Sequence, residues 1–99
     1  MRLSIKTRPQ GCSWTDIEAV WREADLLEPI NAAWLFDHFY PIFSDPDGPC
    51  FEGWTLLAAL LAKTKRLRAG IMVTGIGYRP APVLANMIAT VDHVGRGRL

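Results

Sequence analysis

An aspartate and a histidine, Asp37 and His38, stand side by side directly after a short apolar segment of the chain. Histidine is the side chain best suited to general acid and base catalysis near neutral pH, and it also hydrogen-bonds polar rings. The neighbouring carboxylate can accept hydrogen bonds from a ligand or orient a loop. A purely structural alternative stays open, in which Asp37 caps a turn and His38 packs against Phe39 or Tyr40.

A second candidate group follows a later apolar stretch, where Thr74, Gly75 and Gly77 precede Tyr78 and Arg79. Glycines let the backbone approach a flat ligand closely, although a plain turn explains them equally well. Gly75-x-Gly77 lacks the third glycine of the dinucleotide-binding fingerprint, which disfavours a nucleotide-binding Rossmann site.

Other kinds of chemistry find no support in the sequence. There is no P-loop, no nucleophile elbow and no set of paired zinc ligands, so we expect no metal site. Eleven basic and ten acidic side chains give a net charge of +1, which offers no field to attract nucleic acid. The longest apolar run, residues 53–62, is about half of what a membrane span needs. Cys12 and Cys50 are expected to be reduced thiols in a cytoplasmic protein.

Hydrophobic periodicity predicts the elements that position these groups. Thr15 and Glu18 have the spacing of a capping box, and the helix they open should stop near Glu28, before Pro29. The long Pro-, Asp- and Gly-rich stretch 39–53 is expected to be a functional loop. The expected strands are 3–7, 32–36 and 67–74, and the expected helices are 15–28, 54–64 and a third that starts at Pro82.

Strands and helices therefore alternate, with strand starts roughly 30 to 35 residues apart, the length of a βαβ unit. This alternation predicts an α/β fold in which one domain, residues 1–99, holds a parallel sheet with right-handed crossovers. Half of a doubly wound sheet and the opening arc of a (β/α)8 barrel both fit. In either fold ligands bind beyond the carboxyl ends of the strands, where both candidate groups stand.

The segment 33–38 resembles the second strand of luciferase-like monooxygenases, especially their deazaflavin-dependent branch. Several separated motifs in the right order are more specific than any one of them, and together they span nearly the whole chain. The other matching segments are 51–60, 66–70, 73–75, 78–79, 85–92 and 97–99.

The resemblance implies the first three βα units of a TIM barrel that holds a flavin or deazaflavin at the carboxyl ends of its strands. It implies an oxidoreductase that catalyses hydride transfer or monooxygenation of a small organic substrate. Asp37 would lie near the cofactor or substrate, and His38 would donate or accept a proton. The Asp-His pair favours the deazaflavin coenzyme F-420, with FMN as the alternative. The stretch expected to back the cofactor ring, often through a strained bulge, is Ile71, Met72, Val73, Thr74 and Gly75.

Two departures from the family pattern stand out. Pro80-Ala81-Pro82 replaces the usual His-Pro and is expected to shift the start of the third helix. A complete barrel takes about 250 residues, so 99 residues correspond to its amino-terminal third and are expected to be too short for catalysis alone. We therefore expect a homo-oligomer or completion by the rest of a barrel. The alternative function is a non-catalytic remnant or assembly partner.

Overall fold

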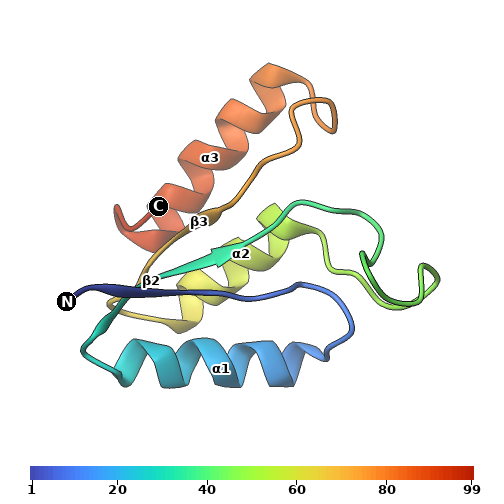
Figure 1. Ribbon diagram of the computed structural model, residues 1–99. Helices are drawn as coiled ribbons and strands as arrows, with labels where there is room; N and C mark the ends of the chain where they lie inside the picture. Colours follow the sequence, from blue (N-terminus) through green and yellow to red (C-terminus); the bar gives the residue numbers. More distant parts are fainter.

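A computed structural model describes all residues from 1 to 99 and confirms the expected alternation of strands and helices (Figure 1). None of the helices has the length and apolarity that crossing a lipid bilayer requires. The elements in chain order are β1 (Leu3–Lys6), α1 (Trp14–Leu26), β2 (Ile30–Leu35), α2 (Gly53–Lys63), β3 (Arg68–Ile71) and α3 (Ala81–Gly95).

The three strands form one sheet in the order β1-β2-β3, and both pairs are parallel. Ala33 pairs with Ile5 on one side and Ala69 on the other, and these three side chains face the helices. Because side chains alternate along a strand, Trp34 projects from the opposite face. A Cβ atom at Gly70 would lie 2.8 Å from the Trp34 ring, so the indole covers that strand position closely. The sheet is open and covered by helices on one face, as in the opening segment of a barrel.

The core lies between this sheet and the helices. Ile17, Trp21 and Ala24 are buried along one face of α1, as the apolar stripe predicts. The buried Trp21 indole N–H donates to the Thr7 hydroxyl over 2.9 Å, which satisfies the indole's one polar atom. Helix α2 is apolar on nearly all sides because it packs against α1, α3 and β3.

The N-cap of α1 was predicted two residues too late, at Thr15. Ser13, with an extended backbone, is the N-cap, and its hydroxyl accepts from Asp16 N–H over 3.1 Å. The Asp16 carboxylate accepts in return from Ser13 N–H, which completes a capping box. Thr15 and Glu18 have the same spacing but stand inside the helix, since Gly11, with a φ of 60°, turns the chain just before Ser13.

Helix α1 also ends earlier than predicted, at Leu26 rather than near Glu28. The Arg66 side chain donates to the carbonyl oxygens of Ala24, Asp25 and Leu27 over distances of 2.9 to 3.1 Å. The carbonyl groups of Ala24 and Leu27 also accept from the backbone N–H groups of Leu27 and Ile30, so the helix end is stabilised both locally and by a residue some 40 positions away, which a local pattern does not reveal.

Strand β3 is shorter than the predicted 67–74. Met72 N–H still donates to the Leu35 carbonyl over 2.7 Å, and the chain then leaves the sheet. The peptide bond between Met72 and Val73 is cis. Residues 72–80 are therefore a loop at the carboxyl end of the sheet, and not the last turn of a strand.

The other predicted boundaries that moved, in β1, β2, α2 and α3, did so by one or two residues. Strand β2 begins at Ile30 because it pairs with Leu3, and helix α3 begins at Ala81 rather than Pro82. After α3 the chain returns to the sheet, where Ala69 N–H donates to the Arg98 carbonyl over 2.9 Å. The last residues thus lie along the outer edge of β3.

Candidate functional site

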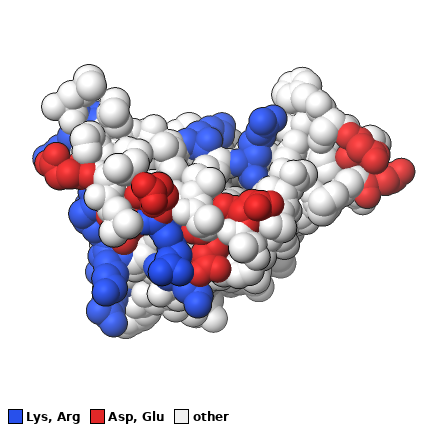
Figure 2. All heavy atoms as spheres, turned by 90° about the horizontal axis from the view of Figure 1, so that it is seen from below, with Lys and Arg blue, Asp and Glu red and all other residues white.

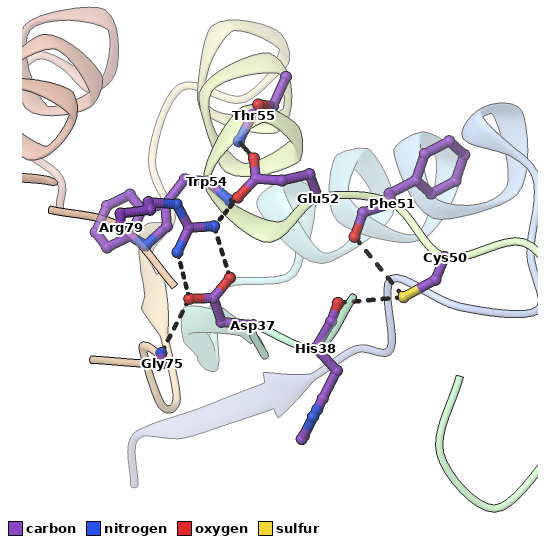
Figure 3. A network of polar contacts seen from close by, with 9 residues as sticks. All are labelled: Asp37, His38, Cys50, Phe51, Glu52, Trp54, Thr55, Gly75 and Arg79. Carbon is purple, nitrogen blue, oxygen red and sulfur yellow. Dashed lines mark hydrogen bonds and ion pairs between the residues drawn. The ribbon is translucent and has the colours of Figure 1, made fainter. Parts of the chain in front are cut away.

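The two groups of residues singled out in the sequence meet at the carboxyl end of the sheet. Asp37, directly after β2, is 3% exposed, and its two carboxylate oxygens accept from the Arg79 guanidinium over 2.7 and 2.8 Å. Gly75 N–H donates to the same carboxylate over 3.0 Å. Figure 3 shows this network, which joins the end of β2 to the loop after β3.

Glu52 brings a third segment into the network. Its carboxylate caps α2 by accepting from the backbone N–H groups of Trp54, over 3.2 Å, and Thr55, over 2.6 Å. It also forms an ion pair with Arg79 (Figure 3). Neither Glu52 nor Arg79 was given a role from the sequence. The only signal was an acidic residue directly before a helix, where a carboxylate is favourable.

The electrostatics keep all three groups charged. Burial raises the pKa of the Asp37 carboxyl, but hydrogen bonds from Arg79 and Gly75 outweigh it, so the pKa lies below its ordinary value. In the same way burial raises the pKa of Glu52, and the hydrogen bonds from Thr55, Trp54 and Arg79 lower it overall. The hydrogen bond to Asp37 raises the pKa of Arg79. Asp37 is therefore a fixed carboxylate whose two oxygens are both occupied.

The His38 side chain, unlike that of Asp37, is not held by hydrogen bonds. Its side chain points away from the Asp37–Arg79 network (Figure 3) and is half-buried, and no hydrogen bond engages either ring nitrogen. The ring meets Phe36 edge-on, with centroids 5.0 Å apart, rather than packing against Phe39 or Tyr40. Its backbone carbonyl accepts from the free thiol of Cys50 over 3.3 Å. The imidazole is thus positioned through its backbone while its nitrogens stay free for a ligand.

The long loop after His38 is anchored by Gln10, which is 7% exposed. The Gln10 amide donates to the Ile42 carbonyl over 2.7 Å and accepts from Ile42 N–H over 2.9 Å. A β-bridge also pairs Gln10 with Cys50. Both ends of the loop are therefore held against the segment that follows β1.

The loop after β3 meets this first loop through two aromatic rings. Phe39 stacks on Tyr78 with centroids 4.4 Å apart, and the Arg79 guanidinium lies 5.5 Å from the Phe39 ring. A Cβ atom at Gly75 would collide with the Tyr78 ring, so a larger residue there would displace this ring from its place. The two loops form one connected rim.

The stretch expected to back a cofactor ring divides into two parts. Ile71 packs against the core, and Gly75 is committed to Asp37. Between them Met72 and Val73 are 41% and 75% exposed, and Thr74 is half-buried. This short segment thus leaves the apolar side chains of Met72 and Val73 uncovered beside the strand ends. No group of three or more His, Cys, Asp or Glu side chains is arranged to hold a metal ion.

A cavity of about 510 Å³ runs along the open edge of β3. Its walls are mostly apolar and include Trp34, Trp54, Ile71, Thr74 and Ile88. The buried Nε1 atom of Trp54 has no hydrogen-bond partner.

On the face drawn in Figure 2, acidic and basic side chains are interspersed over the surface.

A family model described as luciferase-like monooxygenase matches residues 4–99 of this chain. The chain also superposes on an F-420-dependent secondary alcohol dehydrogenase, solved in complex with an F-420–acetone adduct, with a TM-score of 0.79 and 23% sequence identity. The match covers 99% of this chain and 30% of that enzyme, so the chain spans less than a third of its length. No curated protein sequence matches the chain. The comparisons confirm the fold class expected from the sequence.

Proposed function

This chain belongs to the luciferase-like monooxygenase family, and we propose that it forms part of an oxidoreductase that uses coenzyme F-420. The reaction is transfer of a hydride to or from a small organic substrate, with a proton moved by His38. One observation carries the proposal. At the carboxyl end of the sheet a free imidazole stands next to a carboxylate that is locked in place.

Each residue has a distinct part in this proposal. His38 holds or gives up the proton at a ring nitrogen, because both of its nitrogens are free of other partners. Met72, Val73 and Thr74 offer the exposed surface for one face of the cofactor ring. Coenzyme F-420, when bound, supplies the two-electron hydride chemistry.

The choice of F-420 over FMN rests on two points of support. The superposed enzyme is F-420-dependent, and the Asp-His pair after β2 is the feature that resembles the deazaflavin branch. FMN stays the alternative cofactor, since its ring is also flat and would meet the same segment.

A titration tests the proposal directly. The protein purified from its own cells is titrated with F-420 and, separately, with FMN, while ligand fluorescence is recorded. Saturable binding of F-420 that is tighter than binding of FMN supports the proposal. Tighter binding of FMN moves the protein to the flavin-dependent alternative, and binding of neither contradicts the assignment.

The open edge of β3 favours a second candidate, a non-catalytic partner that associates through this edge. No further strand pairs with the outer edge of β3, along which the last residues lie, and an edge of this kind beside an apolar cavity is prone to association. Sedimentation with and without F-420 separates the two functions. A stable oligomer that does not bind F-420 favours the assembly partner.

A further inference from the structure

Arg79 is the one side chain that contacts all three segments of the site. It lies in the loop between β3 and α3, and its ion pairs reach Asp37 after β2 and Glu52 at the start of α2. We infer that Arg79 is a positioning residue that clamps the loop 72–79 onto the carboxyl end of β2. It thereby fixes the proposed ring-backing segment relative to His38. The part of this inference that concerns ring binding rests on the proposed function.

Burial makes the clamp strong. The Arg79 side chain is 9% exposed and that of Asp37 is fully buried, so solvent hardly screens their attraction. The guanidinium contacts both carboxylate oxygens, a two-pronged geometry that also fixes the orientation of the arginine. Removing the cation would leave a buried carboxylate without its partner, an arrangement that proteins avoid.

Both ends of the turn 75–79 are tied to the same carboxylate. Gly75 contributes its backbone N–H, and Arg79 contributes its side chain. Tyr78 N–H donates to the Gly75 carbonyl over 3.2 Å and so closes the turn on itself. The chain just before Gly75 is the segment 72–74, whose exposed side chains face the proposed ring. Loss of the contacts between the turn and Asp37 would therefore let residues 72–74 move.

The clamp also acts on the neighbour of His38. The Phe39 ring stacks on the Tyr78 ring and also lies close to the Arg79 guanidinium. Arg79 thus contacts both residues that neighbour His38 in the chain, Asp37 and Phe39. This geometry gives Asp37 a positioning role and leaves proton transfer to His38.

The test uses Arg79→Ala in the protein purified from its own expression host, with Arg22→Gln as the control. Arg22 is two-thirds exposed on α1 and forms only a 3.9 Å contact with Glu18. Hydrogen exchange of the amides in 72–79 is measured without any cofactor. We expect these amides to exchange at least about tenfold faster in Arg79→Ala than in the unmodified protein, and at an unchanged rate in Arg22→Gln.

Chemical rescue separates a clamp from general destabilisation. Millimolar guanidinium, which can occupy the vacated position beside Asp37, should restore slow exchange in Arg79→Ala, whereas urea, of similar shape but neutral, should not. If Arg79→Ala does not fold, Arg79→Lys is used, which keeps the charge but loses the two-pronged contact. Unchanged exchange in a folded variant overturns the inference.

The consequence for ring binding is measured separately by F-420 titration of the same variants. Arg79→Ala should bind F-420 about tenfold more weakly and recover with guanidinium. If the unmodified protein binds no F-420, the proposed function fails, while the exchange data still decide whether the clamp exists.

Discussion

Asp37 and His38 are adjacent in the chain, but their side chains lie in different environments. Asp37 turns inward and is held by Arg79 and Gly75, whereas His38 turns outward with both ring nitrogens free. Successive side chains of an extended segment point to opposite sides, so Asp37 can be anchored while the side chain of the next residue stays free of hydrogen bonds. Asp37 is therefore held in place, and His38 beside it is the residue that we propose to carry the proton.

His38→Ala should lower turnover by about a hundredfold to ten-thousandfold, the range typical of a lost general acid or base. The thermal midpoint should hardly change, because the ring makes one edge contact with Phe36 and no hydrogen bond. Steady-state kinetics and thermal unfolding of the same preparation check both statements. An unchanged rate would remove His38 from the reaction.

At the scale of elements, the sequence predicted all six helices and strands in their correct order. Apolar periodicity decides which face of an element is buried, and it correctly placed the core face of α1. The boundaries moved because they depend on contacts between distant residues. The Arg66 side chain donates to carbonyl groups at the end of α1 that lie about 40 positions away in the sequence. The ion pair between Asp37 and Arg79 joins residues 42 positions apart. No local pattern encodes such pairs, so the ion pairs of the site could not be predicted either.

The corrected cap of α1 gives a direct comparison of two variants. Ser13→Ala removes the hydroxyl that accepts from Asp16 N–H and should destabilise the protein by about 1 kcal/mol. Thr15→Ala, the position favoured by sequence spacing alone, should cost less, because Thr15 stands inside the helix. Denaturant unfolding measures both free energies. A larger loss in Thr15→Ala would contradict the assigned cap.

Asp25 links α1 to the segment before β3 and makes stability depend on pH. Burial raises the pKa of its carboxyl, but hydrogen bonds from the backbone N–H groups of Leu67, Lys65 and Arg66 outweigh it and lower the pKa. A lowered pKa means that the stabilisation is complete above the ordinary value of about 3.9 and is lost as pH falls through the lowered value.

Asp25→Asn should therefore reduce stability at neutral pH and flatten the loss of stability between about pH 5 and pH 2. Glu23→Gln, at an exposed site on the same helix, should keep the acid sensitivity of the unmodified protein. Urea unfolding across this pH range provides the measurement. If the free energy of unfolding depends equally on pH in all three proteins, Asp25 does not cause the acid sensitivity.

At the scale of the whole molecule, an open three-stranded sheet carries helices on one face and the candidate site at its carboxyl end. The chain corresponds to 30% of the superposed dehydrogenase, and the edge of β3 is bordered by a cavity of about 510 Å³. In the proposed function, His38 and the loop 72–79 form one wall of the site, and the rest of the barrel supplies the others. Ligand binding by the protein as it exists in its own cells is therefore the property that decides its function.

The most direct measurement is an F-420 titration of the protein purified from its own cells, followed by addition of candidate alcohols or ketones. We expect saturable binding of F-420 and a substrate-dependent change in its absorbance as hydride is transferred. Both should be weakened in Arg79→Ala, and the absorbance change should be slowed by at least about a hundredfold in His38→Ala. A protein that binds no F-420, or that transfers hydride equally well without His38, would contradict the central claim.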